Sequence, residues 1–166
     1  MTSSPLLDVR DLSVSFFQGG RESVAVDKVS FQLERGKTLA LVGESGSGKS
    51  ISALSIVRLL PPGAVASGEA LLAGKDMLKI SENELRAVRG ARITMVFQEP
   101  MTSLNPLHTI EQQIGEILEL HGETDRKKVR ARVIELLTEV GIPEPATRLG
   151  AFPHQLSGGQ RQRVMI

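Results

Sequence analysis

A glycine-rich segment in the first third of the chain has the residue types and spacing of a phosphate-binding loop. It fits the pattern G-x-x-x-x-G-K-[ST] and consists of Gly43, Glu44, Ser45, Gly46, Ser47, Gly48, Lys49 and Ser50. Glycines let successive backbone N–H groups turn toward phosphate oxygens, at the positive end of the helix that follows. Lys49 adds a full positive charge, and the Ser50 hydroxyl can coordinate Mg²⁺. The segment therefore predicts a site for a nucleoside triphosphate with Mg²⁺.

Gln98 is a second candidate for the metal site, because it ends an apolar run. That run, 92–97, is typical of a buried strand, and in many phosphate-loop ATPases such a strand ends in the carboxylate that holds the metal. An uncharged amide cannot replace this carboxylate, so we interpret Gln98 as a contact to Mg²⁺ or its water. An ordinary glutamine at a strand end is the alternative. Glu99 leads into Pro100, which favours a loop from this point.

A second glycine motif follows far along the chain. Its residues are Leu156, Ser157, Gly158, Gly159 and Gln160. A serine followed by two glycines at the start of a helix can bind an anion through free backbone N–H groups. Taken alone, the motif fits an ordinary loop-to-helix transition equally well. Two anion-binding helix starts are nevertheless more than one bound nucleotide requires.

The phosphate loop needs a strand before it and a helix after it, and the sequence predicts both. The apolar run 38–42 is typical of a strand covered on both faces, and residues 51–60 have helical spacing. Alternating apolar residues over 7–16 and 24–33 predict an antiparallel pair of strands, separated by Gly19 and Gly20. This context favours a phosphate loop over a glycine-rich turn with an incidental lysine.

The remaining elements are predominantly helical. Short strands are expected at 70–72 and 76–78, and a serine-to-glutamate capping box predicts a helix over 82–89. A second capping box starts a helix at Thr109, and a longer helix over 125–140 ends at a glycine. We interpret the basic residues of this last helix as a solvated face rather than a docking surface.

Composition excludes several classes of protein. The 166 residues are 40% hydrophobic and 23% charged, as is typical of a folded domain. Twenty Lys and Arg against nineteen Asp and Glu give a net charge of +1, which offers no electrostatic footprint for nucleic acid. Because the chain contains no cysteine, disulfides and thiolate metal sites are excluded. No apolar run approaches the ~20 residues that span a bilayer, so we expect a cytoplasmic domain.

In this order and at this spacing, the three motifs resemble those of the ATP-binding subunits of ABC transporters. The segment Gln98–Pro106 is similar to the Q-loop of the dipeptide and oligopeptide importers. Pro153–Gln155, just before the second glycine motif, is also similar to the sequence of these importers. In detail the chain is most similar to the first cassette of the fused ATPases of microcin C-type peptide importers. The resemblance covers essentially the whole chain.

The resemblance implies a role for each motif. Gly43–Ser50 would be the Walker A loop, and Gln98 would sense the γ-phosphate and the membrane partner. Residues 156–160 would be the signature, in which Ser157 and Gly159 face the γ-phosphate held by an opposite cassette. In this family an aromatic residue near the start of the chain stacks on adenine. Phe16 aligns best with it and Phe17 next, and a core strand position is an open alternative for either.

The resemblance also implies partners and a place in the cell. These are a second ABC cassette (fused or separate), transmembrane permease subunits and, indirectly, a periplasmic or surface peptide-binding protein, with no nucleic acid. ATP binding and hydrolysis would drive peptide uptake from the cytoplasmic face of the membrane. Two alternatives stay open: a soluble ABC-type ATPase for DNA repair or translation, and a nucleotide-binding fragment that does not hydrolyse ATP.

The expected fold is an α/β P-loop NTPase core with an N-terminal antiparallel β subdomain and a helical subdomain. We expect 1–98 to hold the β subdomain and nucleotide-binding core, 99–155 the helical subdomain with the Q-loop, and 156–166 the signature and the start of its helix. In the family the general base and the switch histidine follow the signature. We therefore expect the base beyond Ile166, the C-terminal part of the core to be missing, and this segment alone to be inactive. Three histidines are not assigned as the switch: His108, His121 and His154.

Overall fold

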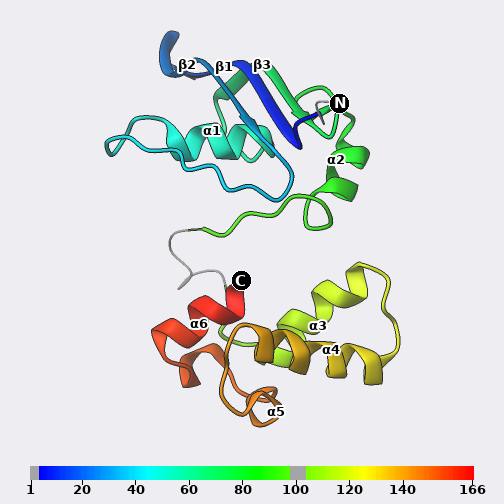
Figure 1. The fold of residues 1–166 in the computed structure, drawn as a ribbon. Coiled ribbons are helices and arrows are strands. Elements are labelled where there is room, and N and C mark those ends of the chain that lie inside the picture. Colours follow the sequence, from blue (N-terminus) through cyan, green and yellow to red (C-terminus); the bar gives the residue numbers. More distant parts are fainter. Residues whose placement is uncertain (1–3, 98–103) are drawn as a thin grey trace. The chain divides into compact units, whose positions relative to one another are not determined.

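The computed structural model describes residues 4–97 and 104–166 (Figure 1). The chain forms two compact units, Met1–Ile93 and Thr94–Ile166. Each unit buries an apolar cluster of its own. The first unit combines a β sheet with two helices, and the second is helical.

An antiparallel sheet of four strands forms the framework of the first unit, in the order β2-β1-β3-β4. The strands are β1 (Leu7–Gln18), β2 (Arg21–Leu33), β3 (Ala64–Leu72) and β4 (Lys75–Asp76). Gly19 and Gly20 make the turn between β1 and β2, both with positive φ, which glycine adopts at little cost. The predicted antiparallel pair is therefore confirmed. The short strand predicted at 70–72 is the end of the longer β3.

Helix α1 (Lys49–Ile56) lies along one face of this sheet (Figure 1). Ile56 joins a buried cluster with Leu12 of β1 and Leu85 of α2 (Glu82–Val88). Burial of such side chains contributes roughly 1.5–3 kcal/mol each. The apolar face of the sheet thus determines where α1 lies. Helix α2 begins with the predicted capping box between Ser81 and Glu84.

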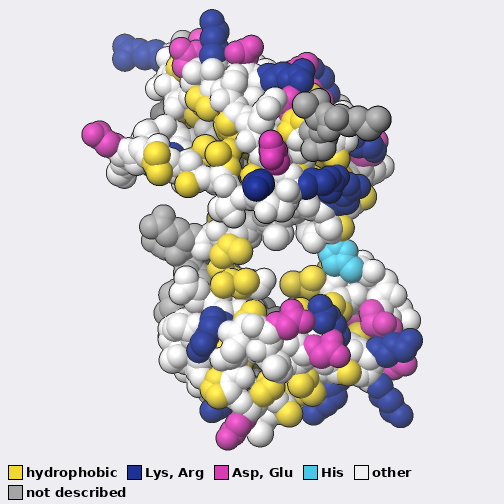
Figure 2. All heavy atoms as spheres, viewed as in Figure 1, with side chains coloured by type: hydrophobic (Ala, Val, Ile, Leu, Met, Phe, Trp, Pro, Cys, Tyr) yellow, Lys and Arg dark blue, Asp and Glu magenta, His cyan; other side chains and the backbone are white. Residues whose placement is uncertain are grey.

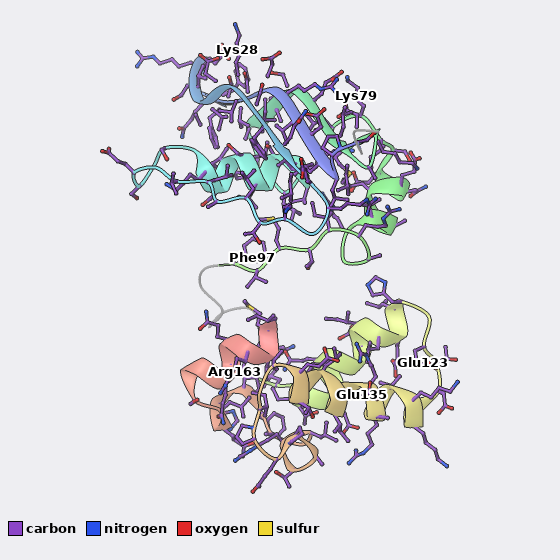
Figure 3. The ribbon with its side chains drawn as sticks, in the orientation of Figure 1. Lys28, Lys79, Phe97, Glu123, Glu135 and Arg163 are labelled. Carbon is purple, nitrogen blue, oxygen red and sulfur yellow. The ribbon has the colours of Figure 1, made fainter. Side chains whose placement is uncertain are left out.

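Two predicted strands are absent from the described structure. The run 38–42 and the run 92–97 contain no strand, although an isolated bridge joins Arg89 to Ile93. Val42 is 88% exposed, and Phe97, labelled in Figure 3, is also exposed. A strand of the buried parallel type needs a hydrogen-bonded neighbour. No strand within the described ranges pairs with either run, so their backbones are irregular.

Helix α1 also ends earlier than predicted, at Ile56 rather than residue 60. Arg58 takes a left-handed conformation with φ 52°, which stops the helix. The N–H of Arg58 bonds to the carbonyl of Ser55, and that of Leu59 bonds to Leu54. These two bonds form a Schellman C-cap.

The second unit consists of short helices around one apolar cluster. They are α3 (Ile110–Leu120), α4 (Arg126–Glu139), α5 (Pro145–Arg148), the 3₁₀ turn η2 (Pro153–Gln155) and α6 (Gly158–Met165). Helix α4 packs Val133 and Leu137 against Ile110 of α3 and Val164 of α6. The glycine predicted to end α4, Gly141, has φ 73°.

Charges of both signs are interspersed on the face of the helical unit shown in Figure 2. Glu135 on α4, labelled in Figure 3, pairs with Arg132 on the same helix. Arg132 also pairs with Glu139 at 3.2 Å. The basic residues of α4 thus include a solvated ion-pair network, as the sequence indicates. Among the helices that the structure describes, none combines the length and apolar character needed to cross a membrane.

Candidate nucleotide-binding site

The phosphate loop depends on glycine at three points. Gly46 and Gly48 have φ of 82° and 86°, in the left-handed region. A Cβ added to Gly48 would lie 2.7 Å from the carbonyl oxygen of Ala25 and 2.9 Å from Cγ2 of Val26. A Cβ at Gly43 would lie 2.7 Å from Oγ of Ser47. Gly48 is therefore closely packed against β2 and cannot carry a side chain without displacing that backbone, Gly46 is favoured by its positive φ, and a side chain at Gly43 would require Ser47 to move.

The ammonium of Lys49 lies inside the curve of the loop. Its Nζ donates to the carbonyl oxygens of Gly43 at 2.8 Å and Glu44 at 2.6 Å, and to Oγ of Ser47 at 3.1 Å. Three donors on one ammonium are thus satisfied by loop oxygens. A phosphate oxygen entering the loop would compete for the same donors with a full negative charge, which makes the stronger hydrogen bond. The geometry suits a lysine that exchanges carbonyl partners for phosphate.

The loop encloses a hollow of about 150 Å³, lined by loop residues, by Ala25 and by Ile51. Helix α1 starts at Lys49 behind it and has no acidic residue in its first turn, so its N-terminal dipole is not neutralised. Ser50 is exposed in that turn, and no described residue hydrogen-bonds its hydroxyl. The residues present therefore fit a phosphate group, with a hydroxyl available to a metal that the phosphate carries.

The described residues offer no separate metal cage. Among them, no three His, Cys, Asp or Glu side chains are close enough together to hold an ion. A metal at this site would depend on nucleotide oxygens, water and a hydroxyl, which is the coordination that Mg²⁺ prefers.

The second glycine motif begins α6 in the helical unit. Leu156 is buried in the apolar cluster and anchors the turn. Ser157 and Gln160 form a capping box: Oγ of Ser157 accepts from the N–H of Gln160 at 3.3 Å, and Oε1 of Gln160 accepts from the N–H of Ser157 at 2.9 Å. No atom lies within 4 Å of a Cβ placed on Gly158 or Gly159. An anion can approach this helix start closely.

Residues 26–166 match the family described as ABC transporter. The chain belongs to the ABC transporter family. This ABC chain is 66% identical over 166 residues to the "Peptidoglycan transport ATP-binding protein YejF" of Agrobacterium fabrum, and the match covers 99% of the chain and 30% of that protein. It is 49% identical over 163 residues to the "Oligopeptide transport ATP-binding protein OppD" of Bacillus subtilis, and this match covers 97% of the chain and 46% of that protein. The chain thus spans less than half the length of these relatives.

Solved ABC structures have the same fold. The dimeric bacterial ABC transporter cassette MJ0796 superimposes with a TM-score of 0.82 at 28% identity, covering 96% of this chain and 67% of the cassette. A second structure of that cassette, bound to ADP and Pi, gives 0.78 at 26% identity. The predicted α/β fold class and the resemblance to peptide importers are both confirmed.

Several residues predicted for the ABC site stay predictions. Gln98 and the first part of the Q-loop lie outside the described residues. Beyond them, Gln113 of α3 fastens the chain to that helix: its Nε2 donates to the carbonyl oxygens of Asn105 at 3.1 Å and His108 at 2.9 Å. Sequence reasoning missed Gln113, because a single polar residue within a helix carries no signal of its own.

The adenine-stacking residue also stays a prediction. Phe16 and Phe17 lie at the end of β1, where Phe16 is half-buried and Phe17 is 54% exposed. In the register of the sheet, Phe16 pairs with Ser23 of β2, beside the stretch that backs the phosphate loop. His154 is exposed, and its ring stacks on Phe152 with centroids 5.8 Å apart.

Proposed function

We propose that this chain binds ATP with its triphosphate in the loop Gly43–Ser50. The observation that carries the proposal is the position of the Lys49 ammonium. It is hydrogen-bonded to three oxygens inside the glycine-rich loop at the start of α1. Backbone N–H groups and the lysine would together bind the β- and γ-phosphates. Phe16, or Phe17 after it, would stack on adenine.

Mg²⁺ would be bound by the nucleotide and by Ser50, with Gln98 contacting the ion or its water. The ion would neutralise charge on the phosphates and polarise the bond to be broken. Ser157 and Gly159 would contact the γ-phosphate held by a second cassette. The two cassettes would then form a head-to-tail pair around two nucleotides. The free approach to Gly158 and Gly159 supports this assignment.

The whole protein that contains this chain would couple ATP hydrolysis to the uptake of peptides. Relatives named for oligopeptide and peptidoglycan transport support this class of cargo. Its partners would be a second cassette, transmembrane permease subunits and, indirectly, an extracytoplasmic peptide-binding protein. It would lie at the cytoplasmic face of the membrane.

Within the chain, we assign nucleotide binding to residues 1–98, contact with the permease to the stretch 99–114 of the helical segment 99–155, and the trans contact to 156–166. The general base would lie outside these residues. Residues 1–166 alone would therefore bind ATP but hydrolyse little or none.

Replacing the loop lysine tests the proposal. In the intact protein, Lys49→Ala removes a charged donor to the phosphates, so ATP affinity should fall roughly tenfold or more. ATP-dependent uptake of a labelled peptide should fall to background. Calorimetric titration and uptake by whole cells are the measurements.

Lys37→Ala is the matched control, because Lys37 is an exposed lysine shortly before the loop, without an ion-pair partner among the described residues. Both its ATP affinity and its uptake should equal those of the unmodified protein. Unchanged uptake in the Lys49→Ala protein would contradict the proposal. Failure of permease subunits to co-purify would contradict the transport role alone.

A further inference from the structure

The C-terminal end of α1 is held by an arginine from outside the helix. The Arg89 guanidinium donates to the carbonyl oxygen of Val57 through Nε at 2.8 Å and Nη2 at 2.6 Å. Nη2 also donates to the carbonyl oxygen of Arg58 at 2.8 Å. The Arg89 side chain is 27% exposed, so these bonds are largely shielded from water.

Helix α1 does not supply this interaction itself. It has no basic residue in its last turn. The final carbonyls of a helix lack intrahelical partners and carry the negative end of the dipole, so a cation there is stabilising. Arg89 supplies that cation from a position 32 residues away.

A second arginine ties the same end of α1 to the start of α2. Nη1 of Arg58 donates to the carbonyl oxygen of Ile80 at 2.8 Å. The Glu82 carboxylate lies between the two arginines, 3.4 Å from Arg58 and 3.6 Å from Arg89. Arg58 retains a left-handed backbone although it is not glycine. The side-chain contacts of Arg58 offset the cost of that conformation.

The opposite end of α1 is the phosphate loop. A helix of eight residues is about 12 Å long, and the Debye length at physiological ionic strength is about 8 Å. The charge of Arg89 therefore acts only weakly on a bound phosphate. A change at Arg89 can reach the phosphates through the position of the helix itself.

We propose that Arg89, with Arg58 and Glu82, is a positioning residue for the nucleotide: it fixes the axis of α1, and so aims the loop amides and Lys49 at the phosphates. This inference rests on the proposed binding of ATP at the loop. Arg89 would act through α1, without contact to nucleotide or metal.

Arg89→Gln in the intact protein tests the inference. The amide cannot make the three donor contacts of the guanidinium, so affinity for ATP and for tripolyphosphate should fall at least about threefold. Calorimetric titration gives both constants, at a temperature where circular dichroism shows each variant fully folded. Arg89→Lys keeps a cation that can donate to the same carbonyls, and it should recover at least half of the lost binding energy.

Arg86→Gln is the matched control, because Arg86 is exposed on α2, three residues before Arg89, and forms no ion pair within the described residues. Its ATP affinity should equal that of the unmodified protein. If Arg89→Gln lowers the unfolding midpoint but binds ATP as Arg86→Gln does, Arg89 is merely structural and the inference is overturned.

Two further variants complete the test. If Arg89→Gln does not fold, Glu82→Gln is the substitute variant. It removes the half-exposed carboxylate between the arginines, and ATP affinity should still fall. Unchanged affinity overturns the inference.

Lys49→Ala separates the two proposals. Normal ATP binding by Lys49→Ala contradicts the proposed function, whereas weak binding by Lys49→Ala with normal binding by Arg89→Gln contradicts the inference alone.

Discussion

Asp8 is a buried carboxylate on β1, with only 5% of its surface exposed. Arg10 donates to its Oδ2 through Nε at 2.9 Å and Nη2 at 2.6 Å, and Gln32 of β2 donates to its Oδ1 at 3.0 Å. The hydrogen bonds from Arg10 and, after them, from Gln32 hold the pKa of the Asp8 carboxyl below its ordinary value. The charged form is therefore the one that stabilises the sheet.

Asp8→Asn should lower the unfolding midpoint at pH 7. A lowered folded-state pKa gives stability that is complete above the ordinary value of about 3.9 and is lost as the pH falls through the lowered pKa. The difference between the variant and the unmodified protein should therefore shrink on acidification below about pH 4. Thermal unfolding followed by circular dichroism across this range measures it.

Asp27→Asn is the control for this change. Asp27 is exposed on β2 and forms no ion pair within the described ranges. Its replacement should leave the midpoint nearly unchanged at every pH. A difference for Asp8→Asn that stays constant from pH 7 to the acid end would contradict the assigned role of its charge.

Helix starts are the elements that this sequence specifies most strongly. Ser81, Thr109 and Ser157 each begin a helix with a capping box. Each box satisfies two backbone N–H groups that would otherwise lack partners. At Thr109, Oγ1 accepts from the N–H of Gln112 at 3.3 Å, and Oε1 of Gln112 accepts from the N–H of Thr109 at 2.8 Å.

Thr109→Ala should lower the free energy of unfolding by about 1 kcal/mol, because the N-cap oxygen is lost. Urea denaturation measures the change. Thr138→Ala is the control, since Thr138 lies inside α4, where its hydroxyl only bonds back to the carbonyl of Ile134. That replacement should change stability by less than about 0.5 kcal/mol. Equal losses in the two variants would contradict a capping role for Thr109.

At the scale of the molecule, the two glycine motifs lie in different compact units. The phosphate loop belongs to the unit Met1–Ile93, and the signature to the unit Thr94–Ile166. Each has an independent apolar cluster: one is centred on the sheet with α1, and the other on α3, α4 and α6.

Purified residues 1–166 should bind ATP yet release phosphate at a background rate. The proposed role of the loop is binding, whereas the general base that the family resemblance implies would lie outside these residues. Calorimetry and a phosphate-release assay measure the two properties on one sample. The intact protein under the same conditions should hydrolyse ATP, and comparable turnover by the segment would refute the division of roles.

Local patterns predicted much of the fold and the loop. Glycines at 46 and 48 are needed because of positive φ and, at 48, a close backbone approach, and each cap forms within four consecutive residues. Such features depend on neighbours in sequence, so they can be read directly. The prediction of a strand at 38–42 was wrong because a buried strand depends on a partner strand that is distant in sequence, and not on its own residues alone.

The sequence by itself determined the phosphate loop, the capped helix starts and the antiparallel hairpin, since each is a property of a few adjacent residues. Only the tertiary structure decided how α1 is held. The bonds from Arg89 to Val57 join positions 32 residues apart, and Ala25 of β2 lies against Gly48 of the loop. Contacts of this kind depend on folding that brings distant segments together, which buries apolar side chains such as Leu12 and Ile56 and leaves the phosphate loop exposed.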